Sequence, residues 1–266
     1  IPNSVNTVSR TTFEKSGIYI NPENWEEDIF YAGDRLVKVD WDTQVENIIV
    51  KDGTRKIEAH AFASCDNIKS ITIPDSVENI GAQAFESCSS LESIYIGSGV
   101  EEIGGAPFMF DVEGHPCISL NNIEVSKDNK NYVSVDGVLF NKEMTELIQY
   151  PIGKKQKEYI IPDSVTKLGY GAFCYCDELK KLTVGKGITE IDYCLLFGCD
   201  NIETVFLPET LTKLDGGAFK YSGIKYIDIP DSVIHLGCEA MTGCRRLETV
   251  NIGKGVSYIH EWAISS

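Results

Sequence analysis

The sequence has little positive charge. Its 24 Lys and Arg residues stand against 40 Asp and Glu, giving a formal net charge of −16 over 266 residues and a pI near 4.7. A protein that binds nucleic acid or an anionic membrane needs a basic face that can contact the phosphates. We therefore expect no nucleic-acid partner and no attachment to an anionic bilayer.

Long apolar runs and a targeting segment are also missing. No stretch of 18 apolar residues occurs, so the sequence predicts no direct membrane insertion in this segment. The chain opens IPNSVNTVSR, without the basic start and apolar core of a signal peptide. Residues 1–18 instead match the middle of a repeating unit, and the chain stops inside another such unit. We therefore expect a fragment of a longer protein, with signal and anchor absent from this piece.

Motifs for catalysis and metal binding are scarce. There is no H-E-x-x-H helix motif and no G-x-S-x-G nucleophile turn. The Gly-Lys-Gly turns at 185–187 and 253–255 lack the other residues of a phosphate loop. Cys174 and Cys176 form C-x-C, and the second cysteine pair of a zinc site is absent. We expect no enzyme activity, no cofactor and no metal site.

One pattern runs through most of the chain. It reads I-x-I-P-D-S-V-x-x-I-G-x-x-A-F-x-x-C-x-x-L, and it is clearest over residues 71–91 (ITIPDSVENIGAQAFESCSSL) and 159–179 (YIIPDSVTKLGYGAFCYCDEL). A fixed period of this length predicts a solenoid, in which each coil packs only on its neighbours. The units start at Ile48, Ile71, Ile94, Tyr159, Leu182, Val205, Ile227 and Val250. Adjoining units are 23 residues apart, except that one residue is lost around Ser222-Gly223.

Each position of the unit has a physical reading. The L-x-x-I-x-I run predicts a short strand with one buried face. Pro-Asp-Ser or Gly-x-Gly then turns the chain out of that strand. The Phe of the pattern is expected to stack in an apolar column, whose members are Phe62, Phe85, Phe108, Phe173 and Phe219, with Leu196, Met241 and Ile264 substituting. Burial of one such side chain contributes roughly 1.5–3 kcal/mol.

Two segments interrupt the period, at about residues 19–47 and 109–158. The first predicts a β-hairpin from residues 29–31 and 36–39, and the second a hairpin from residues 138–140 and 147–150. Within the second insert, residues 123–125 are expected to keep one strand in the solenoid sheet.

The repeating units resemble the BspA-like family of leucine-rich repeats, whose pattern is the one quoted above. Residues 131–142 (NYVSVDGVLFNK) also resemble a hairpin module of that family. The resemblance covers nearly the whole chain. It implies one domain, residues 1–266, folded as a β-rich solenoid: a right-handed leucine-rich-repeat superhelix with a parallel sheet. Family members are typically bacterial, and some protist, cell-surface or secreted proteins, and they resemble adhesins that bind host matrix or plasma proteins.

The nine cysteines suggest either disulfides or a metal site. One slot of the repeat is filled by Cys65, Cys88, Cys176, Cys199 and Cys244, with Ser222 in an intervening coil. Residues in the same slot of adjacent coils lie roughly 5 Å apart, where a disulfide is sterically possible. Because Ser222 fills the slot without a partner, we interpret it as a ladder of buried reduced thiols. Cys117, Cys194 and Cys238 fall outside this ladder, and the pattern assigns them no role.

Two further side-chain patterns have a chemical and a structural reading. Asp75, Asp163 and Asp231 recur at one slot, but calcium needs six to eight oxygen ligands. Hydrogen bonding between Asp and Ser within each turn explains them better. His60 precedes Cys65 by five residues, which suggests a catalytic pair. Because Cys65 belongs to the ladder, the structural reading is favoured there too.

The remaining informative positions point outward from the strands. Most are small and polar, as a solvated sheet requires, whereas Tyr95, Phe206 and Tyr226 are aromatic. Phe206 and Tyr226 are one coil apart, so we expect an exposed aromatic pair, and aromatic residues are enriched in protein-binding surfaces. The alternatives are strand propensity and cover from an insert. The candidate binding surface is Tyr95, Phe206, Tyr226, Ile160 and Lys181.

The sequence therefore favours a non-catalytic, extracellular binding or adhesion module of a bacterial surface protein. Its partner would be a host matrix or plasma protein, bound through the outward strand face and the inserts. A structural stalk that presents other domains is the alternative. An enzyme is the weakest hypothesis, and it would need a cleft at residues 109–158 in which His115 and Cys117 face each other.

Overall fold

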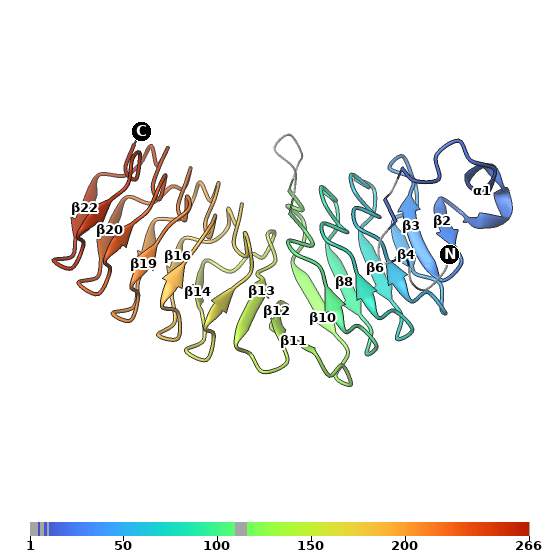
Figure 1. Ribbon diagram of the computed structural model, residues 1–266, viewed down its shortest axis with the longest axis horizontal. Helices are drawn as coiled ribbons and strands as arrows, with labels where there is room; N and C mark the ends of the chain where they lie inside the picture. Colours follow the sequence, from blue (N-terminus) through green and yellow to red (C-terminus); the bar gives the residue numbers. More distant parts are fainter. Residues whose placement is uncertain (1–4, 6–7, 10, 110–115, 266) are drawn as a thin grey trace. The chain divides into compact units, whose positions relative to one another are not determined.

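The computed structural model describes residues 5, 8–9, 11–109 and 116–265. The chain divides into two compact units, residues 1–142 and 143–266. Each unit is a stack of coils whose strands form parallel sheets, so the predicted β-solenoid is confirmed (Figure 1). The organisation as one domain stays a prediction. In the described part of the chain, no helix has the length and apolar character needed to cross a lipid bilayer.

The I-x-I runs form the principal sheet of each unit, as predicted. In the first unit Ile71 pairs in register with Ile48 on one side and Ile94 on the other, and Ile94 pairs with Ile123. The strands of this sheet are β4 (Asn47–Ile49), β6 (Ser70–Ile73), β8 (Ser93–Ile96) and β10 (Asn122–Val125). Strand β10 confirms that residues 123–125 stay in the solenoid sheet.

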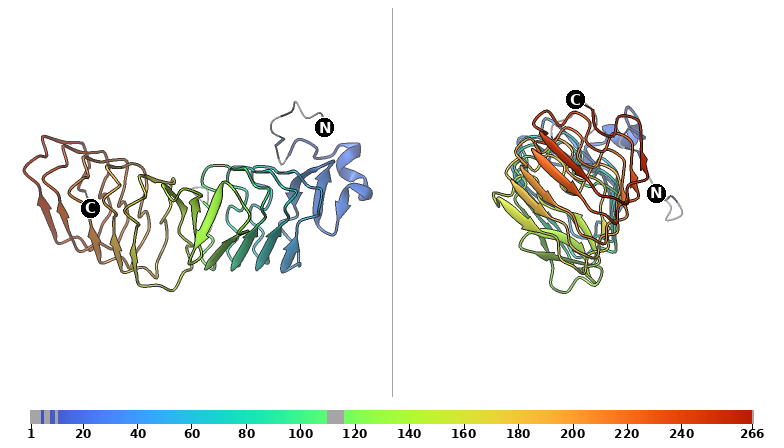
Figure 2. Two further views of the ribbon diagram at one scale, coloured as in Figure 1. Left: turned by 90° about the horizontal axis from the view of Figure 1, so that it is seen from below. Right: turned by 90° about the vertical axis from the view of Figure 1, so that its left-hand side faces the viewer.

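The principal sheet of the second unit has the same construction. Its strands are β14 (Glu158–Ile160), β16 (Lys181–Thr183), β18 (Thr204–Phe206), β20 (Tyr226–Ile229) and β22 (Thr249–Ile252). They lie side by side in one direction, coloured from yellow to red in Figure 2. Alternate residues of each strand point inward, which leaves every second side chain on an outer sheet face.

A second set of short parallel strands follows the turns, and the sequence reading did not predict it. These strands coincide with the x-I of V-x-x-I, as where Ile80 pairs with Ile57 and Ile103. In the first unit they are β5 (Lys56–Ile57), β7 (Asn79–Ile80) and β9 (Glu102–Ile103). In the second unit they are β15 (Lys167–Leu168), β17 (Glu190–Ile191), β19 (Lys213–Leu214), β21 (His235–Leu236) and β23 (Tyr258–Ile259).

The predicted aromatic column lies between these sheets. In the first unit the ring centroids of Phe62 and Phe85 are 5.4 Å apart, and those of Phe85 and Phe108 are 5.3 Å apart. In the second unit Phe173 stacks on Tyr150 at 5.0 Å. All five side chains are fully buried. Burial and ring contact therefore both connect each coil to the next.

After the second strand of some coils, the backbones of adjacent coils approach so closely that only glycine fits. A Cβ on Gly81 would lie 2.3 Å from the amide nitrogen of Ala59, and one on Gly104 would lie 2.3 Å from that of Ala82. Real Cβ atoms do not make such contacts, so glycine is a packing requirement at these two positions, whereas Glu58 fills the same slot one coil before Gly81.

The turn that carries each Phe bends through two left-handed backbone positions. They lie two residues before and two residues after the Phe, as at Gln83 (φ 52°) and Ser87 (φ 56°) around Phe85. Left-handed backbone costs a non-glycine residue roughly 1 kcal/mol or more. The same two positions recur around Phe62 and Phe219, so the strain belongs to the coil geometry.

Both inserts end earlier than predicted. The first hairpin is confirmed as β2 (Ile29–Ala32) and β3 (Arg35–Val39), preceded by β1 (Trp25–Glu26), but β3 also pairs in parallel with β5. Residues 132–141 form a hairpin of β11 (Tyr132–Val135) and β12 (Val138–Asn141). Strand β13 (Glu146–Gln149) then pairs in parallel with β15, as β3 does with β5.

Residues 146–150 are thus part of a coil, and the insert boundary at residue 158 was wrong. Leu147 pairs with Leu168, 21 residues away, whereas Tyr150 stacks on Phe173, 23 residues away. This coil lacks the residues that match Gly-x-x-Ala, so the repeat pattern could not be recognised in its sequence. Gln149 lies at this point of the coil. Its buried side-chain amide donates hydrogen bonds to the carbonyls of Tyr150 and of Ala172 in the next coil.

The N-terminal segment closes the first unit with aromatic side chains. Helix α1 (Gly17–Ile20) and the 3-10 turn η1 (Pro22–Asn24) bring Tyr19 and Trp25 against Phe30 of β2, and Phe13 packs there as well. Phe13 is the Phe of the partial repeat predicted at residues 1–18. Its ring packs on Phe30 of the hairpin and not on the Phe of a neighbouring coil. Part of that stretch lies outside the described residues.

A buried ion pair fastens this segment to the first coils. The Arg35 guanidinium lies 2.6 Å from Glu58 Oε1 and also donates to the carbonyl of Val5, while the amide of Val8 donates to Glu58 Oε2. Both charged side chains are buried, so removal of either one would leave a buried charge without its nearest partner.

The close approach of coils gives a prediction with an adjacent control. Gly104→Ala should lower the free energy of unfolding by about 3 kcal/mol, because its Cβ would meet backbone atoms that cannot move independently. Gly105→Ala should change it by no more than about 1 kcal/mol, because no atom lies within 4 Å of that Cβ. Urea unfolding of both variants measures the difference. Equal effects would show that the coils are not held at this distance.

Tyr150 gives a second stability prediction. Its hydroxyl is buried without a hydrogen-bond partner in the described residues, and burial raises the pKa of its phenol. Tyr150→Phe removes the unsatisfied hydroxyl and keeps the ring stack, so it should stabilise the second unit by about 1 kcal/mol. Tyr150→Ala, which removes the ring, should destabilise it by about 3 kcal/mol. Thermal unfolding tests both, and a destabilising Phe variant would contradict the reading.

Candidate functional site

The outer sheet face of the second unit carries four of the five predicted binding residues. Lys181 of β16 pairs in register with Thr204 of β18, which pairs with Tyr226 of β20. The next outward row contains Ile160 of β14, Thr183 and Phe206. Ile160 and Phe206 are two strands apart, roughly 10 Å. The sheet therefore brings these four predicted residues onto one face.

The aromatic pair on this face is exposed, as expected. Phe206 is 47% exposed and Tyr226 is 49% exposed, and Ile160 is 69% exposed. The fifth predicted residue, Tyr95, is half-buried on β8 of the first unit, in a different sheet.

Polar contacts hold both rings in place. The Lys181 ammonium lies 5.3 Å from the centroid of the Phe206 ring and 3.5 Å from Glu158 Oε2. The Tyr226 hydroxyl lies 3.1 Å from the Thr204 hydroxyl. A cation over an aromatic face and a tethered phenol both reduce rotamer freedom, so the face is partly ordered before any partner arrives.

A groove of about 430 Å³ opens between β18 and β20 beside these rings. Strands β16 and β18 pair over three residues and β20 and β22 over four, whereas β18 and β20 pair only at Thr204 and Tyr226. The inter-coil hydrogen bond that starts the strand is also long here: Lys225 N to Glu203 O is 3.4 Å, against 2.8 Å for Glu203 N to Lys180 O. The two strands separate after one pair.

The groove has its origin in the coil of 22 residues. The lost residue falls at Ser222-Gly223, where the Gly223 amide donates to the Cys199 carbonyl and its Cα approaches Asp200 so closely that a Cβ would lie 1.9 Å from the Asp200 carbonyl oxygen. The chain enters β20 by a shorter path, and the strand loses register with β18. The sequence reading noted the 22-residue step but missed the groove and its acidic lining residues, Glu209, Asp228 and Asp231.

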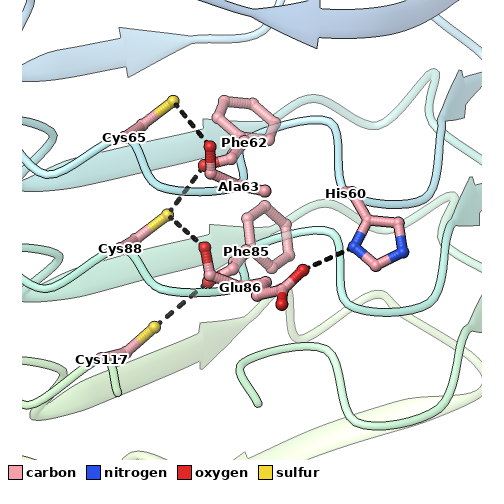
Figure 3. A network of polar contacts seen from close by, with 8 residues as sticks. All are labelled: His60, Phe62, Ala63, Cys65, Phe85, Glu86, Cys88 and Cys117. Carbon is pink, nitrogen blue, oxygen red and sulfur yellow. Dashed lines mark hydrogen bonds and ion pairs between the residues drawn. The ribbon is translucent and has the colours of Figure 1, made fainter. Parts of the chain in front are cut away.

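The cysteine ladder is a structural feature, and it has one more member than predicted. In Figure 3, Cys65, Cys88 and Cys117 lie one below another beside Phe62 and Phe85. The Cys88 thiol donates to the Phe62 carbonyl at 3.1 Å, and the Cys117 thiol donates to the Phe85 carbonyl at 3.1 Å. Placing Cys117 off the ladder was wrong, because the insert changes its spacing in sequence but not its slot.

The second unit repeats this contact. Cys199 donates to the Phe173 carbonyl and Cys244 to the Phe219 carbonyl, both at 2.9 Å. A thiol in this slot thus serves the carbonyl of the Phe one coil earlier. All nine cysteines are free thiols in the structure. Outside the ladder, Cys194 is half-buried and Cys238 is exposed.

The recurring aspartates were expected to form hydrogen bonds within their own turns. Instead, each one accepts a hydrogen bond from the next coil. Asp75 Oδ1 accepts from the Ser98 amide at 2.6 Å, and Asp163 and Asp231 accept from Lys186 and Lys254 at 2.9 and 2.7 Å. Each acceptor is in a Pro-Asp-Ser turn and each donor in the Gly-x-Gly turn of the next coil. The hydrogen bond from Ser98 lowers the pKa of Asp75.

The remaining chemical candidates have structural partners. His60 Nδ1 lies 2.6 Å from Glu86 Oε2 of the next coil, also seen in Figure 3. Among the described residues, no three His, Cys, Asp or Glu side chains gather as a metal site requires. His115 lies outside the described residues, and Cys117 belongs to the ladder.

Comparison with known proteins identifies the repeat. The profile of the BspA-type leucine-rich repeat region matches residues 40–151 and 152–266, with six copies of the repeat. This chain belongs to the BspA-type leucine-rich repeat family. Proteins of this kind are generally non-catalytic repeat proteins and mediate protein interactions. No curated protein matches the chain.

Solved structures of two bacterial proteins are similar to the chain. The pneumococcal vaccine antigen PcpA is 27% identical with a TM-score of 0.73, over 83% of this chain and 55% of PcpA. A leucine-rich cell surface protein from Faecalibacterium prausnitzii A2-165 is 26% identical with a TM-score of 0.73, over 83% of this chain and 57% of that protein. A leucine-rich repeat protein from Eubacterium ventriosum shares the fold at 23% identity and a TM-score of 0.55. The chain thus spans little more than half the length of the first two.

The buried thiols predict how stability depends on pH. Burial raises the pKa of Cys117 to about 12, whereas an unfolded thiol titrates near about 8.5. A raised folded pKa contributes stability that is fully present below the unfolded pKa and is lost as pH rises toward the folded one. Between about pH 8.5 and 12 the wild-type free energy of unfolding should therefore fall more steeply than that of Cys117→Ala, by about 1.4 kcal/mol per pH unit.

Urea unfolding of the two proteins across this pH range measures the difference. The shared contributions of the other thiols and of the tyrosines cancel in the comparison. Parallel curves for wild type and variant would contradict burial of this thiol.

Proposed function

We propose that this chain is a non-catalytic, extracellular binding module of a bacterial surface protein, and that it binds a protein partner through the outer sheet face of its second unit. The observation that carries the proposal is the exposed pair Phe206 and Tyr226 beside the β18–β20 groove. Tyr and other aromatic side chains are enriched among residues that dominate protein-binding energy, and a hollow beside them can take a partner side chain.

The surroundings of the pair support the same reading. Ile160 adds apolar area on β14, and Lys181 adds a charge at the edge of the aromatic surface. An apolar centre with a polar rim is the usual anatomy of a protein interface. The partner proposed is a host matrix or plasma protein. The names of two similar structures, a cell surface protein and a vaccine antigen, support an extracellular location.

Tyr95 is proposed as a separate contact in the first unit. It pairs in register with Thr72 on the neighbouring strand, where most outward side chains are small. Because the two units carry different sheets, binding through Tyr95 can be tested independently of binding through Phe206.

The central test replaces the aromatic pair. Phe206→Ala and Tyr226→Ala should each weaken binding to an immobilised matrix or plasma protein by about thirtyfold, as expected of dominant interface residues, with unchanged thermal unfolding. Tyr193→Ala is the matched control, because Tyr193 is an exposed tyrosine of the same unit that lies outside the principal sheet. Surface plasmon resonance across a panel of purified host proteins measures the affinities.

Absence of saturable binding across the panel would instead support the second function, a spacer that presents other domains. The backbone hydrogen bonding that joins successive coils within each unit favours that alternative. Equal loss of binding in Tyr193→Ala and Phe206→Ala would place the contact away from the outer sheet face.

A further inference from the structure

The β18–β20 groove combines aromatic walls with negative charge. Phe206 and Tyr226 line it together with the carboxylates of Glu209, Asp228 and Asp231, and no Lys, Arg or His residue is among its described lining residues. Elsewhere on this face acidic residues have basic neighbours, as Glu158 has Lys181. The groove is therefore a local concentration of negative charge on a protein that is acidic as a whole.

The three carboxylates retain capacity to bind. Asp228 Oδ1 accepts from the Asn251 side-chain amide at 2.6 Å, and Asp231 Oδ1 accepts from the Lys254 amide at 2.7 Å. A carboxylate has about four lone-pair sites, so each keeps most of its acceptor positions. Within the described part of the chain, no Lys, Arg or His side chain lies within ion-pair distance of Glu209, Asp228 or Asp231. Their charge is thus uncompensated by a direct contact.

The aromatic walls suit a cation as well. The Phe206 ring already has the Lys181 ammonium over it at 5.3 Å, which shows that its face accepts positive charge in this setting. Tyr226, on the neighbouring strand, also lines the groove and is held by its contact with Thr204. A planar guanidinium stacks on aromatic faces and pairs with carboxylates through two parallel hydrogen bonds, whereas a lysine ammonium does only part of this.

We propose that the groove binds an arginine side chain of the protein partner, between the rings of Phe206 and Tyr226 and against the carboxylate of Asp228. This deepens the proposed function, on which it rests, by naming the chemistry of the partner: a basic segment with an exposed arginine. Charge complementarity carries the assignment, since the net charge of −16 also steers basic partners toward the protein.

The test uses the whole chain and a small probe. The peptide acetyl-GSRSG-amide is titrated into protein with labelled Phe and Tyr rings, and the ring signals are followed by NMR. The peptide should shift the Phe206 and Tyr226 signals saturably, with a dissociation constant of roughly 1 mM, as expected for one side-chain contact. The same peptide with citrulline in place of arginine keeps the shape but loses the charge, and it should bind at least about tenfold more weakly.

Two variants locate the contact. Asp228→Asn should weaken arginine binding by about fivefold, because it removes one charge and keeps the side-chain shape. Glu248→Gln is the matched control, since Glu248 is exposed near β22 but does not line the groove, and it should leave binding unchanged. Equal binding of the arginine and citrulline peptides would overturn the proposal, and so would an absence of shifts or an equal effect of both variants.

Failure of this inference can be distinguished from failure of the proposed function. If Phe206→Ala abolishes binding to a host protein while the arginine peptide shifts no ring signal, the outer sheet face is an interface and the arginine assignment is wrong. If the peptide binds as described but no host protein does, the groove has the stated chemistry and the adhesion function is wrong.

Discussion

The backbone hydrogen bond from one coil to the next is the interaction on which the rest of this structure depends. It fixes adjacent coils at one strand spacing along both sheets, and the other constraints follow from that spacing. Gly81 and Gly104 are required because any side chain would enter the backbone of the preceding coil. Side chains also join each coil to the next at this spacing. They do so through stacked Phe rings, thiols that donate to carbonyls, and aspartates that accept from amides.

Much of the fold could be predicted because the repeat states it many times. The principal strands, the Phe column and the first hairpin all follow from local patterns such as I-x-I and an Ala-Gly-Asp turn. The second set of strands was missed because each has only two residues, too few for a periodic signal. Cys117 and Tyr150 were misplaced for a related reason. Residues inserted or lost nearby change their spacing in the sequence, although both side chains occupy regular positions in the stack.

The candidate site was predictable only in part. Alternation along each strand identified Phe206, Tyr226, Ile160 and Lys181 as outward, and the register of the second-unit sheet places them on one face. The groove beside them depends on how two strands separate, which the alternation of side chains along a strand does not reveal. Its signal was present all the same, in the single 22-residue step at Ser222-Gly223.

That step has a wider consequence. In an array of near-identical coils every position on the sheet looks like its neighbours one strand away, so a partner has no landmark by which to choose among them. Removing one residue breaks the translational symmetry locally and creates a place that differs from the neighbouring strands of the second-unit sheet. Deletions and insertions in coil corners leave the stacked interior unchanged. They are thus a way for a repetitive surface to gain a distinct binding position.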